Sequence, residues 1–181
     1  MDIYKERFTS LQHEILRFLF VNPTKAFNQR QLALNLQVSP TAISKSLEHL
    51  KKESLITAEK EKEGKRIAIK LNRDNESTFY LKRIENLRGI YESGLLSFLS
   101  EKFPLSTIIL FGSYSLGEDI ERSDIDIAII GKEKPLELDE YEKTLKREIN
   151  IQFYSSLKNI ETHLKNNIIN GITLKGGVNL T

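Results

Sequence analysis

Residues 110–130 read LFGSYSLGEDIERSDIDIAII, and this stretch decides how the second half of the chain folds. The apolar runs Thr107–Phe111 and Ser123–Ile130 predict two β-strands around a short loop or helix. Successive side chains of a strand point to opposite faces, so Asp124 and Asp126 share one face of the second strand. We therefore expect two neighbouring carboxylates at the start of a buried strand.

Two carboxylates at this spacing predict a metal site. Like charges this close repel each other unless a cation lies between them. Carboxylate oxygens suit Mg²⁺, which binds through one or two of them together with phosphate oxygens and water. Gly112 ends the first strand, where the backbone can approach a ligand and the next N–H groups can hold an anion. If the two strands are antiparallel neighbours, phosphate cradle and metal pair lie at one edge, as nucleotidyl transfer requires.

The ordered string Gly112, Ser113, Gly117, Ser123, Asp124 and Asp126 resembles the nucleotidyltransferase superfamily that includes DNA polymerase β, most closely its minimal nucleotidyltransferase branch. The resemblance runs from about residue 104 to residue 155. It implies a nucleoside triphosphate (NTP) bound with Mg²⁺, and an acceptor hydroxyl that attacks the α-phosphate and releases pyrophosphate. The implied metal ligands are Asp124 and Asp126, and the implied nucleotide-binding residues are Gly112, Ser113 and Ser123.

Two departures from that family leave the activity open. The family usually carries a third carboxylate on the next strand, and Asn150 stands at the matching position of the predicted strand Glu148–Phe153. An amide can offer a metal its carbonyl oxygen but is no base at neutral pH. Glu148 shares that face and could substitute. Leu116 stands where many relatives have Arg, with Arg122 nearby. The expected catalytic residues are Asp124, Asp126 and Asn150, in either a retained transferase or a degenerate domain that senses nucleotides.

Residues 32–56 read LALNLQVSPTAISKSLEHLKKESLI and organise the first part of the chain. A helix is predicted from Ser10 to the Asn22-Pro23 stop, and Asn28 can cap a second one. Ser39 as N-cap and Pro40 at the first helical position predict a third, which buries Ile43, Leu47 and Leu50. Two strands, Leu55–Ala58 and Arg66–Leu71, then enclose a charged tip.

This order resembles a winged helix-turn-helix of the MarR-like or ArsR-like kind, over residues from about 8 to 72. Ser54 departs from the family, which usually has Gly before the wing. The resemblance implies that the third helix enters the major groove of double-stranded DNA and that the wing follows the phosphates. The alternative is a protein-interaction module, since the tip mixes acids with bases. The implied DNA-binding residues are Pro40, Thr41, Ser44 and Lys45 on the helix and Lys62, Lys65 and Arg66 on the wing.

Between these regions the pattern predicts one long helix or two, which Gly89 and Gly94 weaken. Its apolar stripe has steps close to the 3.5-residue period of a helix seam. The stripe either packs on the next domain or forms a homodimer, which winged-helix proteins use on palindromic sites. The stripe consists of Tyr80, Ile84, Leu87, Tyr91, Leu95 and Phe98.

The composition of the whole chain limits which kinds of site and which location are expected. Of its 181 residues, 39% are hydrophobic and 29% charged, cysteine is absent, and the formal net charge is only +2. These values exclude disulfides and thiolate metal sites, and any basic DNA-binding surface must be local. There is no long apolar run and no signal peptide in MDIYKERFTS, so no membrane association and a cytoplasmic location are expected.

The expected fold class is α+β with two domains. A winged helix (residues 1–74) and a connecting helix (75–103) precede a mixed-sheet nucleotidyltransferase-like α/β domain (104–181). Three functions fit this organisation: a transcriptional regulator that senses or transfers nucleotides, an enzyme that nucleotidylates a protein or small molecule, and an antitoxin with a toxin-type protein partner.

Overall fold

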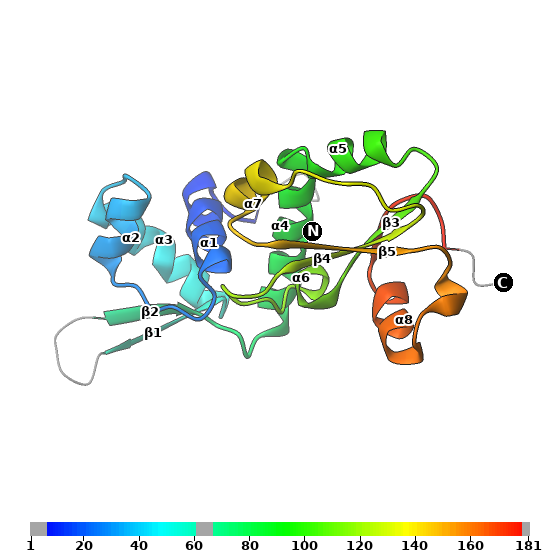
Figure 1. The fold of residues 1–181 in the computed structure, drawn as a ribbon. Coiled ribbons are helices and arrows are strands. Elements are labelled where there is room, and N and C mark those ends of the chain that lie inside the picture. The colour runs from blue at the N-terminus through cyan, green and yellow to red at the C-terminus, as the bar shows by residue number, and fades with distance from the viewer. Residues whose placement is uncertain (1–6, 61–66, 179–181) are drawn as a thin grey trace. The chain divides into compact units, whose positions relative to one another are not determined.

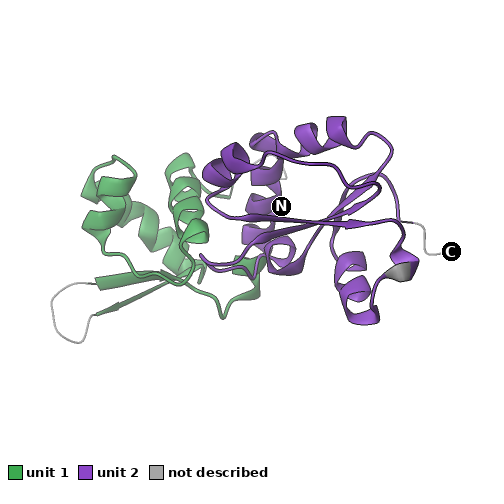
Figure 2. Ribbon diagram, viewed as in Figure 1, with its two compact units in different colours: residues 1–79 green, residues 80–181 purple. Residues whose placement is uncertain are grey.

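The computed structural model describes residues 7–60 and 67–178, in two compact units that comprise residues 1–79 and 80–181 (Figure 2). It is a mixture of helices and two separate β-sheets (Figure 1). Among the described residues, no helix combines the length and the apolar character that crossing a bilayer requires. Each unit has its own core, and each is described by itself.

Three helices open the first unit: α1 (Ser10–Val21), α2 (Gln29–Asn35) and α3 (Pro40–Lys52). The N-cap residues are the local sequence signals that predict where these helices begin. The side chain of Asn28 accepts from the backbone N–H of Gln31 at 2.9 Å, and the Ser39 hydroxyl accepts from Ala42 at 3.2 Å. Such caps satisfy N–H groups that the helix leaves unpaired and contribute about 1 kcal/mol each. The predicted starts of α2 and α3 are confirmed.

The hairpin of this unit consists of β1 (Ile56–Lys60) and β2 (Ile67–Leu71), which pair antiparallel. Ser54, just before β1, has a φ of 57°, in the left-handed region that favours glycine. This explains the Gly that the winged-helix pattern has at this position. The predicted strand at 66–71 is confirmed from Ile67 onward. The wing residues Lys62, Lys65 and Arg66 lie outside the described residues.

Of the two alternatives for the connecting stretch, one long helix or two, the structure has two, α4 (Glu76–Glu92) and α5 (Leu95–Lys102). They separate at Gly94, whose φ is 79°, and not at Gly89, which lies within α4. The predicted separate segment 75–103 does not stand apart in the structure. Leu95 and Leu99 of α5 are fully buried in the core of the second unit, so the division falls earlier, after residue 79.

The helix α4 buries polar side chains and exposes apolar ones. Lys82 and Asn86, one turn apart, are 1% and 7% exposed, whereas Tyr80, Ile84 and Tyr91 of the apolar stripe are 54–64% exposed. Packing on the next domain, one of the two explanations of the stripe, does not hold for these three residues. Of the six residues of the predicted stripe, only Leu95, which belongs to α5, is fully buried.

The second unit is built on a mixed sheet with the strand order β5-β4-β3-β6. β3 (Thr107–Phe111) pairs antiparallel with β4 (Ile125–Ile130), and β4 pairs parallel with β5 (Ile149–Tyr154). The last strand, β6 (Ile172–Lys175), pairs antiparallel with β3 and was not predicted. The mixed sheet is as expected, and the antiparallel β3–β4 pair fulfils the condition set for a shared edge.

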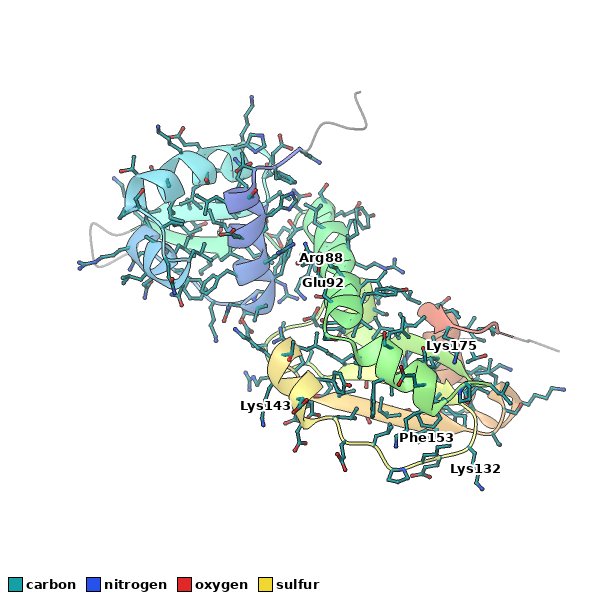
Figure 3. The ribbon with its side chains drawn as sticks, turned by 90° about the horizontal axis from the view of Figure 1, so that it is seen from above. Arg88, Glu92, Lys132, Lys143, Phe153 and Lys175 are labelled. Atoms are coloured by element: carbon teal, nitrogen blue, oxygen red, sulfur yellow. The ribbon has the colours of Figure 1, made fainter. Side chains whose placement is uncertain are left out.

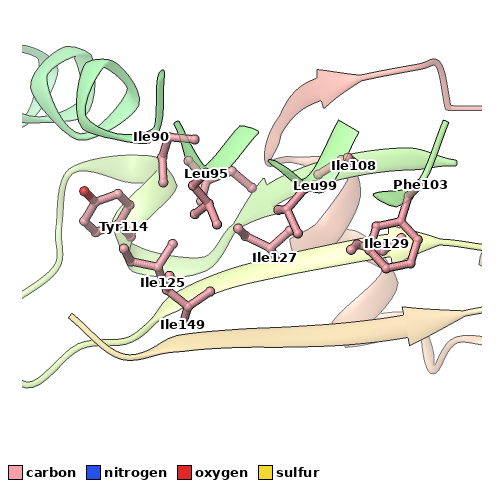
Figure 4. Close-up of a cluster of buried hydrophobic side chains, with 11 residues drawn as sticks. Ile90, Leu95, Leu99, Phe103, Ile108, Tyr114, Ile125, Ile127, Ile129 and Ile149 are labelled. Atoms are coloured by element: carbon pink, nitrogen blue, oxygen red, sulfur yellow. The ribbon is translucent and has the colours of Figure 1, made fainter. Parts of the chain in front are cut away.

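Helices cover both faces of this sheet (Figure 1). On one face, α5 and α7 (Asp139–Leu145) pack with the alternate residues Ile125, Ile127 and Ile129 of β4, in the core shown in Figure 4. On the other face, η1 (Leu157–Asn159) and α8 (Thr162–Ile169) pack on Phe111 and Ala128. Because Asp126 alternates with Ile125 and Ile127, its side chain leaves the first core for the second face.

Candidate nucleotide and metal site

The candidate site lies where three strands of the second unit begin or end. β3 leads directly into α6 (Gly112–Leu116), β4 begins just after Asp124, and β5 begins at Ile149. In the ladders, Phe111 is opposite Asp126, and Asp126 is opposite Asn150. The antiparallel and the parallel pairing therefore bring Gly112, Asp126 and Asn150 to one edge of the sheet.

Gly112 has two reasons to be glycine. Its φ is 71°, a conformation that side chains other than hydrogen disfavour by about 1–2 kcal/mol. A Cβ atom built on it would lie 2.6 Å from Oδ2 of Asp126. The carboxylate therefore occupies the space that a side chain at this position would need, and the backbone of β3 approaches Asp126 closely.

The two carboxylates differ in their surroundings. Asp124 is exposed, whereas Asp126 is half-buried. Burial raises the pKa of Asp126, and the charge of Asp124 raises it further. A hydrogen bond from Asn150 Nδ2 to Asp126 Oδ1, 3.0 Å long, acts in the opposite direction. Asp126 thus lies beside a like charge and accepts a hydrogen bond from an amide.

Asn150 occupies the position expected for the third carboxylate, directly opposite Asp126 in the parallel ladder. Glu148 lies before β5, and its side chain is exposed while its carbonyl accepts from Ile125 N at 2.8 Å. Leu116, which stands where many relatives have Arg, is 41% exposed on α6. Within residues 7–60 and 67–178, no group of three or more histidine or acidic side chains converges as metal ligands.

The two serines of the motif have different local roles. Ser123 closes the turn before Asp124, because its hydroxyl accepts from the Ile120 N–H at 3.0 Å and its own N–H donates to the Ile120 carbonyl at 3.0 Å. Ser113 is half-buried in α6, and its carbonyl accepts from Glu118 N at 3.0 Å. Ser123 therefore fixes the backbone that leads to Asp124.

A groove of about 570 Å³ opens on the β5 side of Asp124. It is lined by the turn before β4, by α7 and by the residues that lead into β5, and Figure 3 shows Lys143 on α7. No residue of β3 or α6 contributes to it. The lining residues are Glu121, Arg122, Ser123, Asp124, Asp139, Glu142, Lys143, Lys146, Arg147 and Glu148.

The sequence interpretation missed a buried charged cluster beside the site. Asp119, in the turn after α6, is 1% exposed and forms ion pairs with Lys82 of α4 and Arg147. Burial raises the pKa of the neighbouring Tyr114, and the charge of Asp119 raises it further. The one signal that could have revealed this cluster is the i, i+4 spacing of Lys82 and Asn86, opposite the apolar stripe.

In the first unit, α3 presents the predicted DNA-contacting residues at its start. Pro40, Thr41 and Lys45 are exposed, whereas Ser44 is half-buried and lines a small groove of about 160 Å³ between α3 and the hairpin. The carbonyl of Pro40 accepts from the Gln29 side chain at 2.6 Å, which ties the start of α3 to α2. The structure therefore leaves Pro40, Thr41 and Lys45 exposed and Ser44 partly covered.

Two kinds of comparison with known proteins give matches, one with solved structures and one with a family model. No curated protein matches it. Matching solved structures include "a zinc-responsive MarR family member, Lactococcus lactis ZitR" (20% identity, 57% of this chain, 81% of that chain, TM-score 0.34) and wild-type Lactococcus lactis ZitR in complex with DNA (22%, 57%, 80%, TM-score 0.33). Likeness at these TM-scores carries no conclusion for this chain. Residues 92–174, from the end of α4 to β6, match the family model of the nucleotidyltransferase domain.

Proposed function

We propose that the protein is a DNA-binding regulator whose second unit binds an NTP with Mg²⁺ and transfers a nucleotide to an acceptor hydroxyl. One observation carries the nucleotide site: the ladders set Gly112 and Asn150 on either side of Asp126, with the glycine backbone against the carboxylate. This supports a phosphate position next to a metal position.

The donor set fits Mg²⁺. Asp124 and Asp126 would hold the ion through their carboxylates, and the Asn150 carbonyl could add a third oxygen after its amide turns. Hard oxygen ligands in this number leave coordination positions for phosphate oxygens and water. When bound, the ion would neutralise charge on the phosphates. The raised pKa of Asp126 also supports a bound cation, because a carboxylate beside a like charge is stabilised by a positive ion.

The groove beside Asp124 is the proposed acceptor site. In an in-line displacement the attacking and leaving oxygens lie on opposite sides of the phosphorus. With the leaving phosphates on Gly112 and Ser113, the attacking hydroxyl comes from the β5 side, where the groove opens. The new bond joins the acceptor oxygen to the α-phosphorus, pyrophosphate leaves, and the hydroxyl proton passes to Glu148 or to water.

The first unit would bind double-stranded DNA through α3. Short polar side chains beside a lysine at the exposed start of a helix suit base edges and phosphates in the major groove. Thr41 and Lys45 are exposed there, and Pro40 and Ser44 complete the proposed surface together with the wing residues Lys62, Lys65 and Arg66. Replacement of Lys45 by Glu should abolish retention of DNA in a gel-shift assay.

The exposed stripe on α4 supports a homodimer. Tyr80, Ile84 and Tyr91 expose more than half of their surface on one face of a helix, in a spacing typical of a helix seam. Sedimentation of the wild type as a dimer and of Ile84→Glu as a monomer would support this proposal. A monomeric wild type would contradict it. Co-purification of a second protein would instead favour the toxin-partner alternative.

The experiment that tests the nucleotide site uses α-labelled ATP and Mg²⁺. Calorimetry measures binding, and release of pyrophosphate with transfer of the label measures turnover. The double variant Asp124→Asn, Asp126→Asn should lose both, while Asp74→Asn, an exposed carboxylate of the first unit, should change neither. Binding without turnover would indicate a nucleotide sensor, and absence of Mg²⁺-dependent binding by any NTP would refute the proposed site.

A further inference from the structure

The inner face of α4 holds a buried cluster of charges, here called the Asp119 cluster and made of Lys82, Asn86, Asp119 and Arg147. Lys82 and Asp119 are each 1% exposed and form an ion pair. Arg147 is 8% exposed, and its Nη2 lies 3.4 Å from Oδ2 of Asp119. Asn86 Nδ2 lies 2.7 Å from Oδ1 of Asp119. One carboxylate therefore receives three side chains from two distant segments.

The cluster joins the parts of the unit that present the candidate site. The Asn86 side chain also donates to the Tyr114 carbonyl of α6, at 2.9 Å. Asp119 lies in the turn that ends five residues later at Asp124, and Arg147 precedes Glu148 at the start of β5. α4 is thus bonded to α6, on the proposed phosphate side of the site, and to the turn that leads to the proposed metal ligand Asp124. Arg147 connects the same turn to the segment before β5, which lines the proposed acceptor groove.

Stability is a poor explanation for such a cluster. Removing charges from water costs free energy that a buried ion pair often only just recovers, and well-packed apolar side chains in its place are frequently as stable. The specific gain from paired buried charges is that only one arrangement satisfies all of them. Here that arrangement fixes the turn between α6 and β4, where Asp124 is otherwise exposed.

We propose that the Asp119 cluster is the positioning device of the nucleotide and metal site, and that Lys82, Asp119 and Arg147 act on the ligand through Asp124. The proposal rests on the proposed function, because it assigns these residues to the same site. Partners that orient a ligating side chain typically change affinity by about 10- to 100-fold when they are removed.

Lys82→Met is the variant that tests this with the least damage. Methionine keeps the apolar stem, and the loss of Lys82 leaves Asp119 paired with Arg147, one charge against one. The matched control is Arg88→Met on the same helix, where Arg88 forms exposed ion pairs with Glu85 and Glu92 (Figure 3). Calorimetry with ATP and Mg²⁺ is done at a temperature at which circular dichroism shows all three proteins folded.

We expect Lys82→Met to weaken ATP·Mg²⁺ binding by about 10- to 100-fold and Arg88→Met to leave it unchanged. An unchanged affinity in folded Lys82→Met would overturn the proposal. Amide hydrogen exchange of the protein without ligand tests the positioning role independently of nucleotide binding. It therefore distinguishes a failure of this proposal from a failure of the proposed function. If the wild type binds no ATP, the nucleotide site fails, and exchange still decides whether the cluster positions the loop. Faster exchange confined to residues 112–124 in Lys82→Met supports it, and an unchanged or uniformly faster rate contradicts it.

Discussion

Asp119 and Asp126 lie seven residues apart, and their environments are opposite. Asp119 is 1% exposed and is bonded by Lys82, Arg147 and Asn86. Asp126 is half-buried, receives one hydrogen bond from Asn150 and lies beside the like charge of Asp124. The first carboxylate has its compensating cations within the chain, whereas the groups that act on the second are an amide and another carboxylate.

Asp119 is therefore a structural carboxylate whose charge is compensated within the protein, whereas Asp126 is available to bind a ligand. A buried charge is tolerated only when the protein supplies its partners. A carboxylate left with an amide and a neighbouring carboxylate has a raised pKa and gains from a bound cation. The contrast gives four predictions, in order of decreasing expected effect.

Replacement of Asp119 by Ala should have the largest effect on stability. The change leaves Lys82 and Arg147 buried without the carboxylate that they share, and breaking a buried ion pair from one side costs about 3–5 kcal/mol. Urea unfolding followed by circular dichroism measures the loss. The control Arg88→Met should cost less than about 1 kcal/mol, because it removes only exposed ion pairs. Equal losses of unfolding free energy in both variants would contradict the distinction between the buried and the exposed ion pairs.

Asn150→Asp should convert the site into one that depends on metal. The change removes the hydrogen bond that lowers the pKa of Asp126 and adds a like charge, so the protein without metal should be less stable at neutral pH. With Mg²⁺ at 100 times its Kd, binding should then raise the free energy of unfolding by about 2.7 kcal/mol. Thermal melts with and without Mg²⁺ measure this, and the idea fails if the wild type shows an equal gain at the same concentration.

Gly112→Ala should cost about 1–2 kcal/mol and also the nucleotide site. The backbone strain at its φ of 71° accounts for the loss of stability, and the new Cβ displaces the Asp126 carboxylate. Gly94→Ala is the matched control, since its φ is 79° and nothing lies within 4 Å of the added Cβ. Both variants should melt earlier, but only Gly112→Ala should lose ATP·Mg²⁺ binding. Unchanged ATP·Mg²⁺ binding in Gly112→Ala would show that binding does not require the Asp126 carboxylate in its observed position.

The smallest effect concerns the pH dependence of stability. Because the pKa of Asp126 is raised in the folded protein, the folded state binds its proton more tightly than the unfolded chain. The contribution is present below the ordinary Asp pKa of 3.8 and is lost as the pH rises through the raised value. At neutral pH and without metal, Asp126→Asn should therefore melt slightly later than the wild type. An earlier melt would mean that the ionised carboxylate stabilises the fold.

The candidate site was largely predictable because its signals are local. Alternation along a strand set Asp124 and Asp126 on one face, and the apolar runs on either side predicted the strands. The position of Asn150 also followed from alternation, and the parallel ladder confirms it opposite Asp126. The roles of these residues, and of Gly112, Ser113 and Ser123, stay predictions that the experiments above test.

Other elements were missed because their signals come from distant parts of the chain. β6 is only four residues long, and its pairing with β3 spans more than sixty residues. The stripe on α4 was correctly seen as apolar, but its burial depends on which face the neighbouring elements cover. The break at Gly94 could not be distinguished from one at Gly89 by composition, since both residues are glycine.

By itself the sequence determined the helix caps at Asn28 and Ser39 and the strand alternation around Asp126. Each of these depends on interactions within a few residues or on the period of one element. Only the tertiary structure decided that Asp119 is a buried structural carboxylate and Asp126 an under-compensated one. Asp119 lies in a polar turn and Asp126 in an apolar strand, yet it is Asp119 that is buried, because the free energy of a charge depends on the partners that folding brings to it from elsewhere in the chain.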